Sequence, residues 1–381
     1  MLREDNRGRR ILGWWVALAL LLGSPAVTAP QADEGFRQAR NLRDSGDLDG
    51  AGTLLRALLQ ETPDSGEAHQ LLADVLEQQG RTDDARAERR AAYDAGIRQA
   101  AMLRLLGRDL ISEHAFGLAA RVLEQADALE PLAFGPRQGL ALALAQAERY
   151  DEAVEQLSVL LALAPDEIAV RTARMRAEIV LGHEQAALAD LQFLVRARPE
   201  DVEYQLLHGK ILARMGRYSE SISVFEKVLT LKAAPDQLSI ARADIGSAHG
   251  QMGDVIAAEE GYREALLLDS GNAIAAANLA DLLTGEEGRQ EAERILRTAM
   301  ARTPQASLLY YHLGKLQLSQ GQAEDAETNL RAAVQRNPGN PRYHYQLALA
   351  LHRQDKIAEA EEEMAVHKKL LERYRSRSGM E

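Results

Sequence analysis

The feature that most constrains this chain is a pattern that returns every 34 residues. Residues 307–340 show it in full. Leu309 and Leu313 lie on one face of a first helix, because they are four residues apart. Gly321 can close that helix in the left-handed backbone conformation, and Pro338 ends a second apolar stripe. The segment therefore predicts two antiparallel helices followed by a proline-closed turn.

Ten copies of this unit follow one another from residue 32 to residue 374. They span 32–65, 66–99, 100–133, 134–167, 168–201, 202–238, 239–272, 273–306, 307–340 and 341–374. The twentieth residue is alanine in nine units and Ser221 in the sixth. A small side chain at this position lets two helices cross closely, whereas a larger one would push their backbones apart. The sixth unit also has three additional residues near 233–238.

The small residues, the closing prolines and the period resemble the tetratricopeptide repeat family over 343 of the 381 residues. The resemblance implies an all-α fold, a right-handed α-solenoid of about ten helix-turn-helix units. Repeats 1–6 (32–238) and repeats 7–10 (239–374) would then belong to the same solenoid. We interpret the insertion at 233–238 as a seam in it, with a hinge as the alternative. Residues 375–381 are expected to be disordered.

Residues 1–26 have the layout of a secretory signal peptide, with arginines first, an apolar run next and a small-residue exit. We expect cleavage after Ala26, which would place the protein in the periplasm of a bacterium. The alternative is an uncleaved anchor at 11–29, about long enough to span a bilayer, which would hold the protein on the inner membrane facing the periplasm. Membrane contact is expected only in that second case.

Composition and motifs argue against several classes of function. The chain has no cysteine, which excludes disulfides and thiolate metal sites, and its net charge of −12 argues against nucleic-acid binding. None of the nine histidines has metalloprotease spacing, and neither a phosphate loop nor a nucleophile elbow is present. We therefore predict that the protein is not an enzyme and expect no cofactor and no metal.

The family resemblance implies a concave groove lined by the fifth and ninth residues of each unit. Six of these twenty positions are basic, with Arg40 as the first of them, although lysine and arginine make up only 45 of 381 residues, so that about 2.4 are expected. The predicted basic stripe consists of Arg104, Arg108, Arg176, Lys210, Lys315 and, one turn further on, Arg214. Such a stripe on an acidic protein would attract and orient an anionic partner.

Two tyrosines hold the same place in repeats nine and ten, Tyr311 and Tyr345. Exposed aromatic side chains on a rigid helix are good anchors for a peptide or a sugar, whereas packed ones belong to the core. The family's carboxylate clamp, which grips the end of a peptide, cannot be carried over to this chain. Asn278 is its only suitable asparagine, and the neighbouring positions do not match.

Polar residues interrupt the apolar pattern at two places. Arg89 takes a normally apolar position, and we interpret it as part of a solvated helix face. In repeat five, Arg174 and Glu178 replace apolar residues and are four residues apart, so they could pair along the helix. This repeat is either a loosely packed helix or a polar binding spot.

Together these features predict a non-catalytic scaffold or adaptor of the bacterial envelope. It would bind an extended or helical segment of a protein partner in the groove, steered by the basic stripe and anchored by the tyrosines. One alternative is a component of polysaccharide export that binds an anionic glycan in the same stripe. The other is a membrane-anchored, chaperone-like assembly factor, which would retain residues 1–26.

Overall fold

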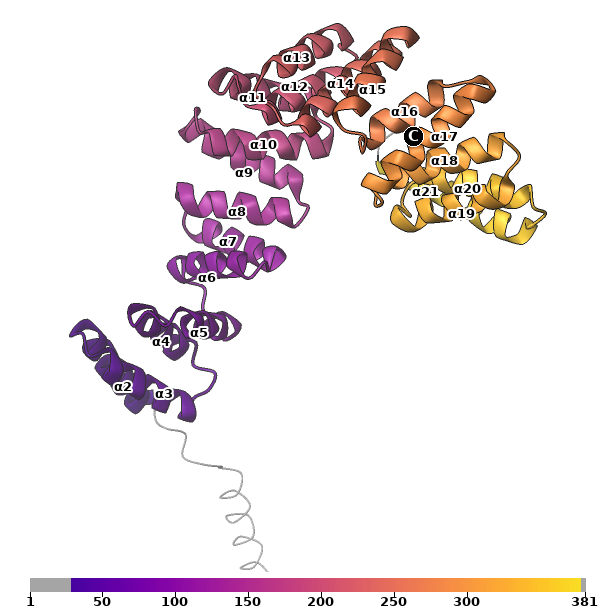
Figure 1. Ribbon diagram of the computed structural model, residues 1–381. Helices are drawn as coiled ribbons and strands as arrows, with labels where there is room; N and C mark the ends of the chain where they lie inside the picture. Colours follow the sequence, from indigo (N-terminus) through magenta and orange to yellow (C-terminus); the bar gives the residue numbers. More distant parts are fainter. Residues whose placement is uncertain (1–28, 378–381) are drawn as a thin grey trace, which may run out of the picture. The chain divides into compact units, whose positions relative to one another are not determined.

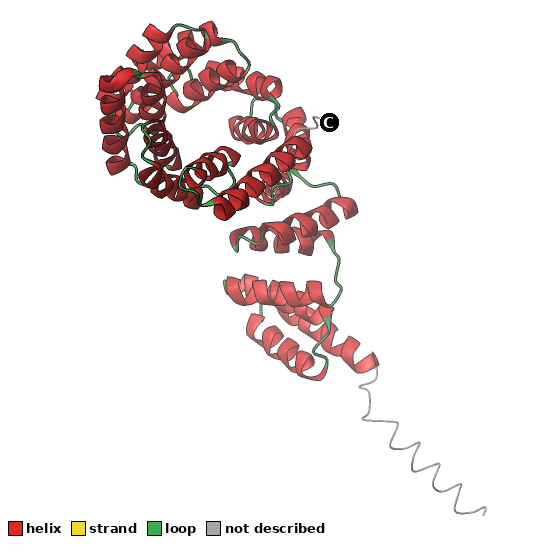
Figure 2. Cartoon of the chain, turned by 90° about the vertical axis from the view of Figure 1, so that its right-hand side faces the viewer, coloured by secondary structure: helices red, strands yellow, loops and turns green. Residues whose placement is uncertain are grey.

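The computed structural model describes residues 29–377 as helices joined by short loops, with no strand among them (Figures 1 and 2). The first helices of the pairs are α2 (Ala29–Asp44), α4 (Gly66–Gln78), α6 (Ala100–Ser112), α8 (Phe134–Gln146), α10 (Ile168–Leu181), α12 (Val202–Arg214), α14 (Pro235–Gln251), α16 (Ala273–Leu282), α18 (Ser307–Ser319) and α20 (Pro341–His352). The second helices are α3 (Leu48–Glu61), α5 (Thr82–Asp94), α7 (Phe116–Leu129), α9 (Tyr150–Leu163), α11 (Glu184–Ala197), α13 (Tyr218–Thr230), α15 (Val255–Leu268), α17 (Gly285–Arg302), α19 (Ala323–Arg336) and α21 (Ile357–Arg377). The all-α solenoid fold class is confirmed.

The small residues of the pattern lie where the two helices of a pair cross. All ten side chains at the twentieth position of the units are buried. The helices α14 and α15 cross closely, since a Cβ added to Gly261 would lie 2.9 Å from the Cα of Gly246. Gly321 closes α18 with a φ of 81°, the left-handed conformation that the sequence indicates there.

First helices of successive repeats also contact one another. α2 contacts α4, and α6 contacts α8, while in the C-terminal half α12, α14, α16, α18 and α20 contact in succession. Each of these helices also packs against the second helix of its own pair. Within each of these stretches the first helices therefore form a layer, and the second helices of the pairs lie on its other side. We call the side made by the first helices the first-helix layer.

The described chain divides into two compact units, one ending at Val170 and the other beginning at Arg171. Each has buried apolar clusters of its own, built mostly from leucine and alanine. The seam predicted at 233–238 lies inside the second unit. Pro235 is the first residue of α14, so the additional residues lengthen this helix at its start and do not form a longer loop.

The two ends of the described chain bear on the predicted disordered tail and on the predicted signal peptide. α21 continues to Arg377, so residues 375–377 are helical and not disordered as predicted. Residues 1–28, which hold the predicted signal peptide and all but the last residue of the predicted anchor, lie outside the described part. Between residues 29 and 377, no helix combines the length and apolar character needed to cross a membrane.

Arg89 is buried, with 2% of its surface exposed, so its interpretation as part of a solvated face is wrong. Its Nε donates a 2.6 Å hydrogen bond to Asp109 on α6, and its terminal nitrogens donate to Glu77 on α4. An arginine can occupy this apolar position because the neighbouring helices supply carboxylates that compensate the buried charge.

The polar residues of repeat five also bind within the fold. Arg174 donates two hydrogen bonds of 2.7 and 2.8 Å to Asp190 on α11, which is fully buried and also accepts one from Arg171. Glu178 is paired with His183 at 2.8 Å. These side chains link α10 to α11. Their contacts explain why polar residues occupy these positions, and no binding partner is needed to explain them.

Candidate partner-binding groove

A cavity of about 610 Å³ lies between α6 and α8 on the first-helix layer. Its walls are largely apolar and include Leu105 and Ile111 from α6 and Pro136 from α8, with Leu123 of α7 behind them. Two members of the basic stripe, Arg104 and Arg108, also line it. A cavity of this size and lining falls in the range of ordinary ligand pockets.

Glycines in α8 make room for this cavity. Gly135 and Gly139 both line it, and a Cβ added to Gly139 would lie 3.3 Å from the Cδ1 of Ile111. This cavity was not predicted from the sequence. The signal was the segment from Gly135 to Gly139, since it places two glycines and a proline in a first helix, where side chains usually fill the space.

The arginines at the cavity are paired with carboxylates of neighbouring helices and loops. Arg104 donates a 3.0 Å hydrogen bond to Glu130, which directly follows α7. Arg108 contacts Glu77 of α4 and Asp109 of its own helix, each at 3.4 Å, and 57% of its side chain remains exposed. The weaker geometry leaves Arg108 the more available of the two for a carboxylate from outside.

The members of the basic stripe in the second unit are also paired. Arg176 bonds Glu203 at 2.8 Å, Lys315 bonds Asp281 at 3.1 Å, and Arg214 pairs with Glu184. Lys210 lies 3.7 Å from Asp244. Each of these stripe residues therefore faces a carboxylate, which offsets part of the positive charge predicted from the sequence.

Two of these carboxyl groups have shifted pKa values. Burial raises the pKa of Asp244 to about 6, and the attraction of Lys210 only partly opposes this effect. One carboxyl oxygen of Asp244 is buried without a hydrogen-bond partner. Burial also acts on Asp281, but the hydrogen bond from His312 and the charge of Lys315 outweigh it and lower the pKa of that group.

The predicted tyrosine anchors have different surroundings. Tyr311 is half-buried, because its ring stacks on the buried ring of Tyr343 at 4.9 Å between centroids. Tyr345 is exposed, with its ring 5.4 Å from that of His367. Tyr311 therefore contributes to the core, and Tyr345 alone of the two retains the exposure that an anchor needs.

Two further findings bear on the function of this surface. The side-chain amide of Asn278 on α16 donates hydrogen bonds to Ser247 and Tyr262, within 3.4 Å, so it joins repeat eight to repeat seven. In the part of the chain from 29 to 377, no three histidine or carboxylate side chains are grouped so that they could hold a metal ion.

Comparison with known proteins places these helix pairs in context. Models of the tetratricopeptide repeat match residues 42–92, 173–237, 282–341 and 311–370, which together exceed half of the chain. No curated protein matches the chain. A solved tetratricopeptide repeat protein from Parabacteroides merdae is 19% identical, covers 66% of this chain and 98% of its own length, and superposes with a TM-score of 0.53. At that identity, the likeness concerns the fold alone.

Two other solved structures are less similar. The complex of Naa15 and Naa10 bound to HypK-THB is 16% identical, covers 89% of this chain and 63% of the other, and gives a TM-score of 0.47. A structure of MamA from MSR-1 is 23% identical, covers 45% of this chain and 96% of its own, and gives a TM-score of 0.39.

Proposed function

The chain belongs to the tetratricopeptide repeat family, and from that premise we propose that it is a non-catalytic adaptor that binds a segment of a protein partner across its first-helix layer. Tetratricopeptide repeats are protein-interaction scaffolds, and their rigid stacked helices suit the recognition of extended or helical segments. The finer proposal concerns the place of binding, the chemistry of the partner and the location in the cell.

The observation that carries the proposal is the cavity between α6 and α8. It lies on the first-helix layer, is lined mainly by apolar groups and opens beside Arg104 and Arg108. A partner segment would insert apolar side chains there. A carboxylate of the segment would then replace the long contacts that Arg108 makes with Glu77 and Asp109. Apolar burial supplies most of the binding free energy in this arrangement, and the arginines orient the segment.

The paired stripe weakens the alternative of an anionic glycan ligand. A polyanion would have to displace the carboxylates of several stripe residues at once, and it would meet their negative charge along the whole stripe. We place the adaptor in the bacterial envelope, on the strength of the signal-peptide layout of residues 1–26. Mass measurement of the mature protein tests this location, since export predicts a chain that starts at Val27.

Filling the cavity tests the proposed site. Gly139→Leu would place a side chain between α8 and Ile111, and Gly117→Leu is the matched control, since a Cβ at Gly117 on α7 meets no atom within 4 Å. Both changes put the same residue into a helix of neighbouring repeats. We would use wild type and both variants as baits in envelope extract and identify the retained proteins by mass spectrometry.

A partner retained by wild type and by Gly117→Leu, but lost by Gly139→Leu, supports the cavity as the binding site. Equal retention by all three baits places binding elsewhere, with the exposed face around Tyr345 as the next surface to vary. If no bait retains a protein, the adaptor proposal itself fails.

A further inference from the structure

Four large apolar side chains of α15 are exposed, Val255, Ile256, Leu267 and Leu268, and two of them are much more exposed than the others. Ile256 is 82% exposed and Leu267 is 87% exposed. They are eleven residues apart, which is close to three helical turns, so both point the same way about 16 Å apart. Glu260 and Arg263 lie between them on the same stripe.

Comparison of the ten repeats shows that these two apolar residues are peculiar to the seventh. The residues at the position of Ile256 in the other units are Asp49, Asp83, Gly117, Asp151, Gln185, Ser219, Gln290, Glu324 and Ala358. The residues at the position of Leu267 are Gln60, Asp94, Ala128, Ala162, Arg196, Thr230, Ala301, Gln335 and Lys369. The repeat fold therefore needs no large apolar group at either place, and both side chains require another explanation.

From Ile256 to Leu267, the side chains on this face of α15 are apolar, acidic, basic and apolar in turn. Two copies in antiparallel orientation would therefore place apolar opposite apolar and acidic opposite basic. We propose that α15 is a homodimer interface, in which two copies of the chain pair their α15 helices antiparallel about a two-fold axis near Gly261 and Tyr262. Ile256 of one copy then meets Leu267 of the other, and Glu260 meets Arg263. Each contact occurs twice, as a closed two-fold interface requires.

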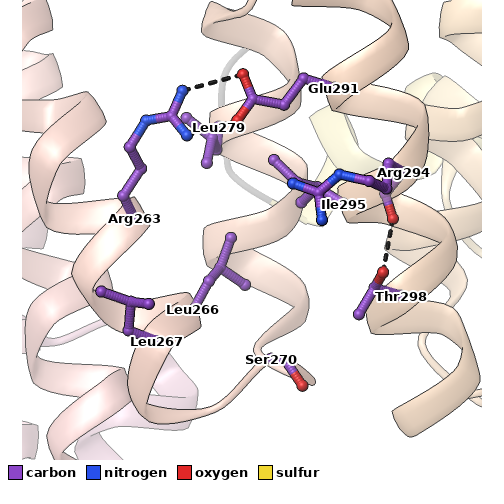
Figure 3. A pocket seen from close by; sticks show the side chains of 9 residues that line it. All are labelled: Arg263, Leu266, Leu267, Ser270, Leu279, Glu291, Arg294, Ile295 and Thr298. Atoms are coloured by element: carbon purple, nitrogen blue, oxygen red, sulfur yellow. Dashed lines mark hydrogen bonds and ion pairs between the residues drawn. The ribbon is translucent and has the colours of Figure 1, made fainter.

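The surroundings of α15 fit this pairing. A cavity of about 370 Å³ separates α15 from α17, with Leu266, Leu267 and Ile295 among its lining residues (Figure 3). It lies beside Leu267 and would receive the partner copy's Ile256. This cavity gives the apolar contact a recess instead of a flat surface.

The charges on this face are also suitable. Glu260 is exposed and forms no ion pair with another residue of the described chain, so it retains a carboxylate for the partner copy. Arg263 is held in place by Glu259 and Glu291, at 2.9 and 2.6 Å. Arg294 lies on the other rim of the cavity and adds a second cation within the same region (Figure 3).

The size of the interface sets its expected strength. α15 has 14 residues and is therefore about 21 Å long. Two such helices with their flanking side chains bury an area at the low end of specific interfaces, about 1,000 to 1,200 Å². We expect a reversible dimer with a dissociation constant in the micromolar range, and this inference does not depend on the groove.

Cysteine pairing tests the register, because the natural chain contains no cysteine. We would prepare Ile256→Cys and Leu267→Cys separately, then oxidise each alone and as an equimolar mixture. The antiparallel register predicts a disulfide-linked dimer in the mixture and little in either variant alone. Cysteines at the same position on both copies would lie about 16 Å apart, and a disulfide needs Cα atoms within about 7 Å. Cross-linking of each variant with itself, but not in the mixture, would overturn this register.

Sedimentation equilibrium tests whether α15 is the interface. Leu267→Asp should weaken the dimer at least tenfold, because it places a carboxylate in the apolar contact. Leu163→Asp, at the exposed C-terminal end of α9, should leave association unchanged, since that leucine is 68% exposed but lies on another repeat. A wild-type chain that stays monomeric up to about 200 μM contradicts the proposal, as does a dimer that Leu267→Asp does not weaken.

Discussion

At the scale of single residues, the structure buries charged side chains that the sequence alone did not place in the core. Arg89 and Asp190 are buried among helices, and each has oppositely charged partners from neighbouring elements. Asp244 is different, because Lys210 lies 3.7 Å away and no hydrogen bond reaches its inner oxygen. These sites have opposite consequences for stability.

The raised pKa of Asp244 makes stability depend on pH. Its folded-state pKa of about 6 lies above its ordinary value of 3.8, so the folded protein binds this proton more tightly than the unfolded chain does. Ionisation therefore costs stability as the pH rises through 4 to 6. We expect Asp244→Asn to be more stable than wild type at pH 7.5, by on the order of 2 to 3 kcal/mol.

Urea unfolding at several pH values checks this expectation. The difference between wild type and Asp244→Asn should shrink as the pH falls through 6 to 4 and disappear below about pH 3, well under the ordinary pKa of 3.8, where the wild-type carboxyl is protonated in both states. A constant difference across the pH range would mean that the effect comes from packing and not from ionisation.

Arg89 should behave in the opposite way, because its removal leaves buried carboxylates unpaired. We expect Arg89→Met to lower the free energy of unfolding by about 3 to 5 kcal/mol. Adding Asp109→Leu to that variant should recover part of the loss, since both buried charges of the pair are then replaced by apolar groups. Chemical denaturation of the two variants measures the effect, and a loss below about 1 kcal/mol for Arg89→Met would contradict it.

At the scale of secondary-structure elements, the distance between paired helices depends on small residues. At the crossing of α14 and α15, a glycine of one helix faces a glycine of the other. A methyl group at this point meets backbone atoms, which cannot rotate away as a side chain can.

Two alanine substitutions in this helix pair separate close approach from helix propensity. Gly261→Ala would bring its Cβ to 2.9 Å from the Cα of Gly246, so we expect it to destabilise the protein by about 1 to 3 kcal/mol. Gly250→Ala, whose Cβ would make an ordinary 3.6 Å contact with Ala258, should be neutral or stabilise by up to about 1 kcal/mol. Thermal unfolding compares them, and equal effects would show that the crossing tolerates a wider spacing.

At the scale of the whole molecule, stability is local, because contacts join each helix pair to its neighbours along the chain. A change in one repeat should then loosen adjacent repeats and leave distant ones protected. This property distinguishes a solenoid from a domain with a single core.

Hydrogen exchange of Arg89→Met tests that property. We expect faster amide exchange in α4 to α7, which flank the lost ion cluster, and unchanged exchange in α18 to α21. Mass spectrometry of proteolytic fragments from wild type and variant measures both regions in one experiment. Faster exchange throughout the chain would show that the repeats unfold as one cooperative body.

The sequence by itself determined the fold class and the 34-residue unit that holds one helix pair. The reason is that the apolar period, the closing prolines and small residues such as Ala326 and Gly321 act within a single 34-residue unit. The exception at Pro235 arose from an insertion, which the pattern located but could not assign to a loop or a helix.

Only the tertiary structure decided which surfaces are available to a partner. Arg108 meets Glu77 from 31 positions away, and the α6–α8 cavity depends on glycines that face a different helix. Likewise, Arg89 is buried only because α6 places a carboxylate beside it. Such contacts depend on how far side chains reach between helices once the repeats stack. A repeat pattern fixes which face each residue occupies but carries no information about the residue it meets there.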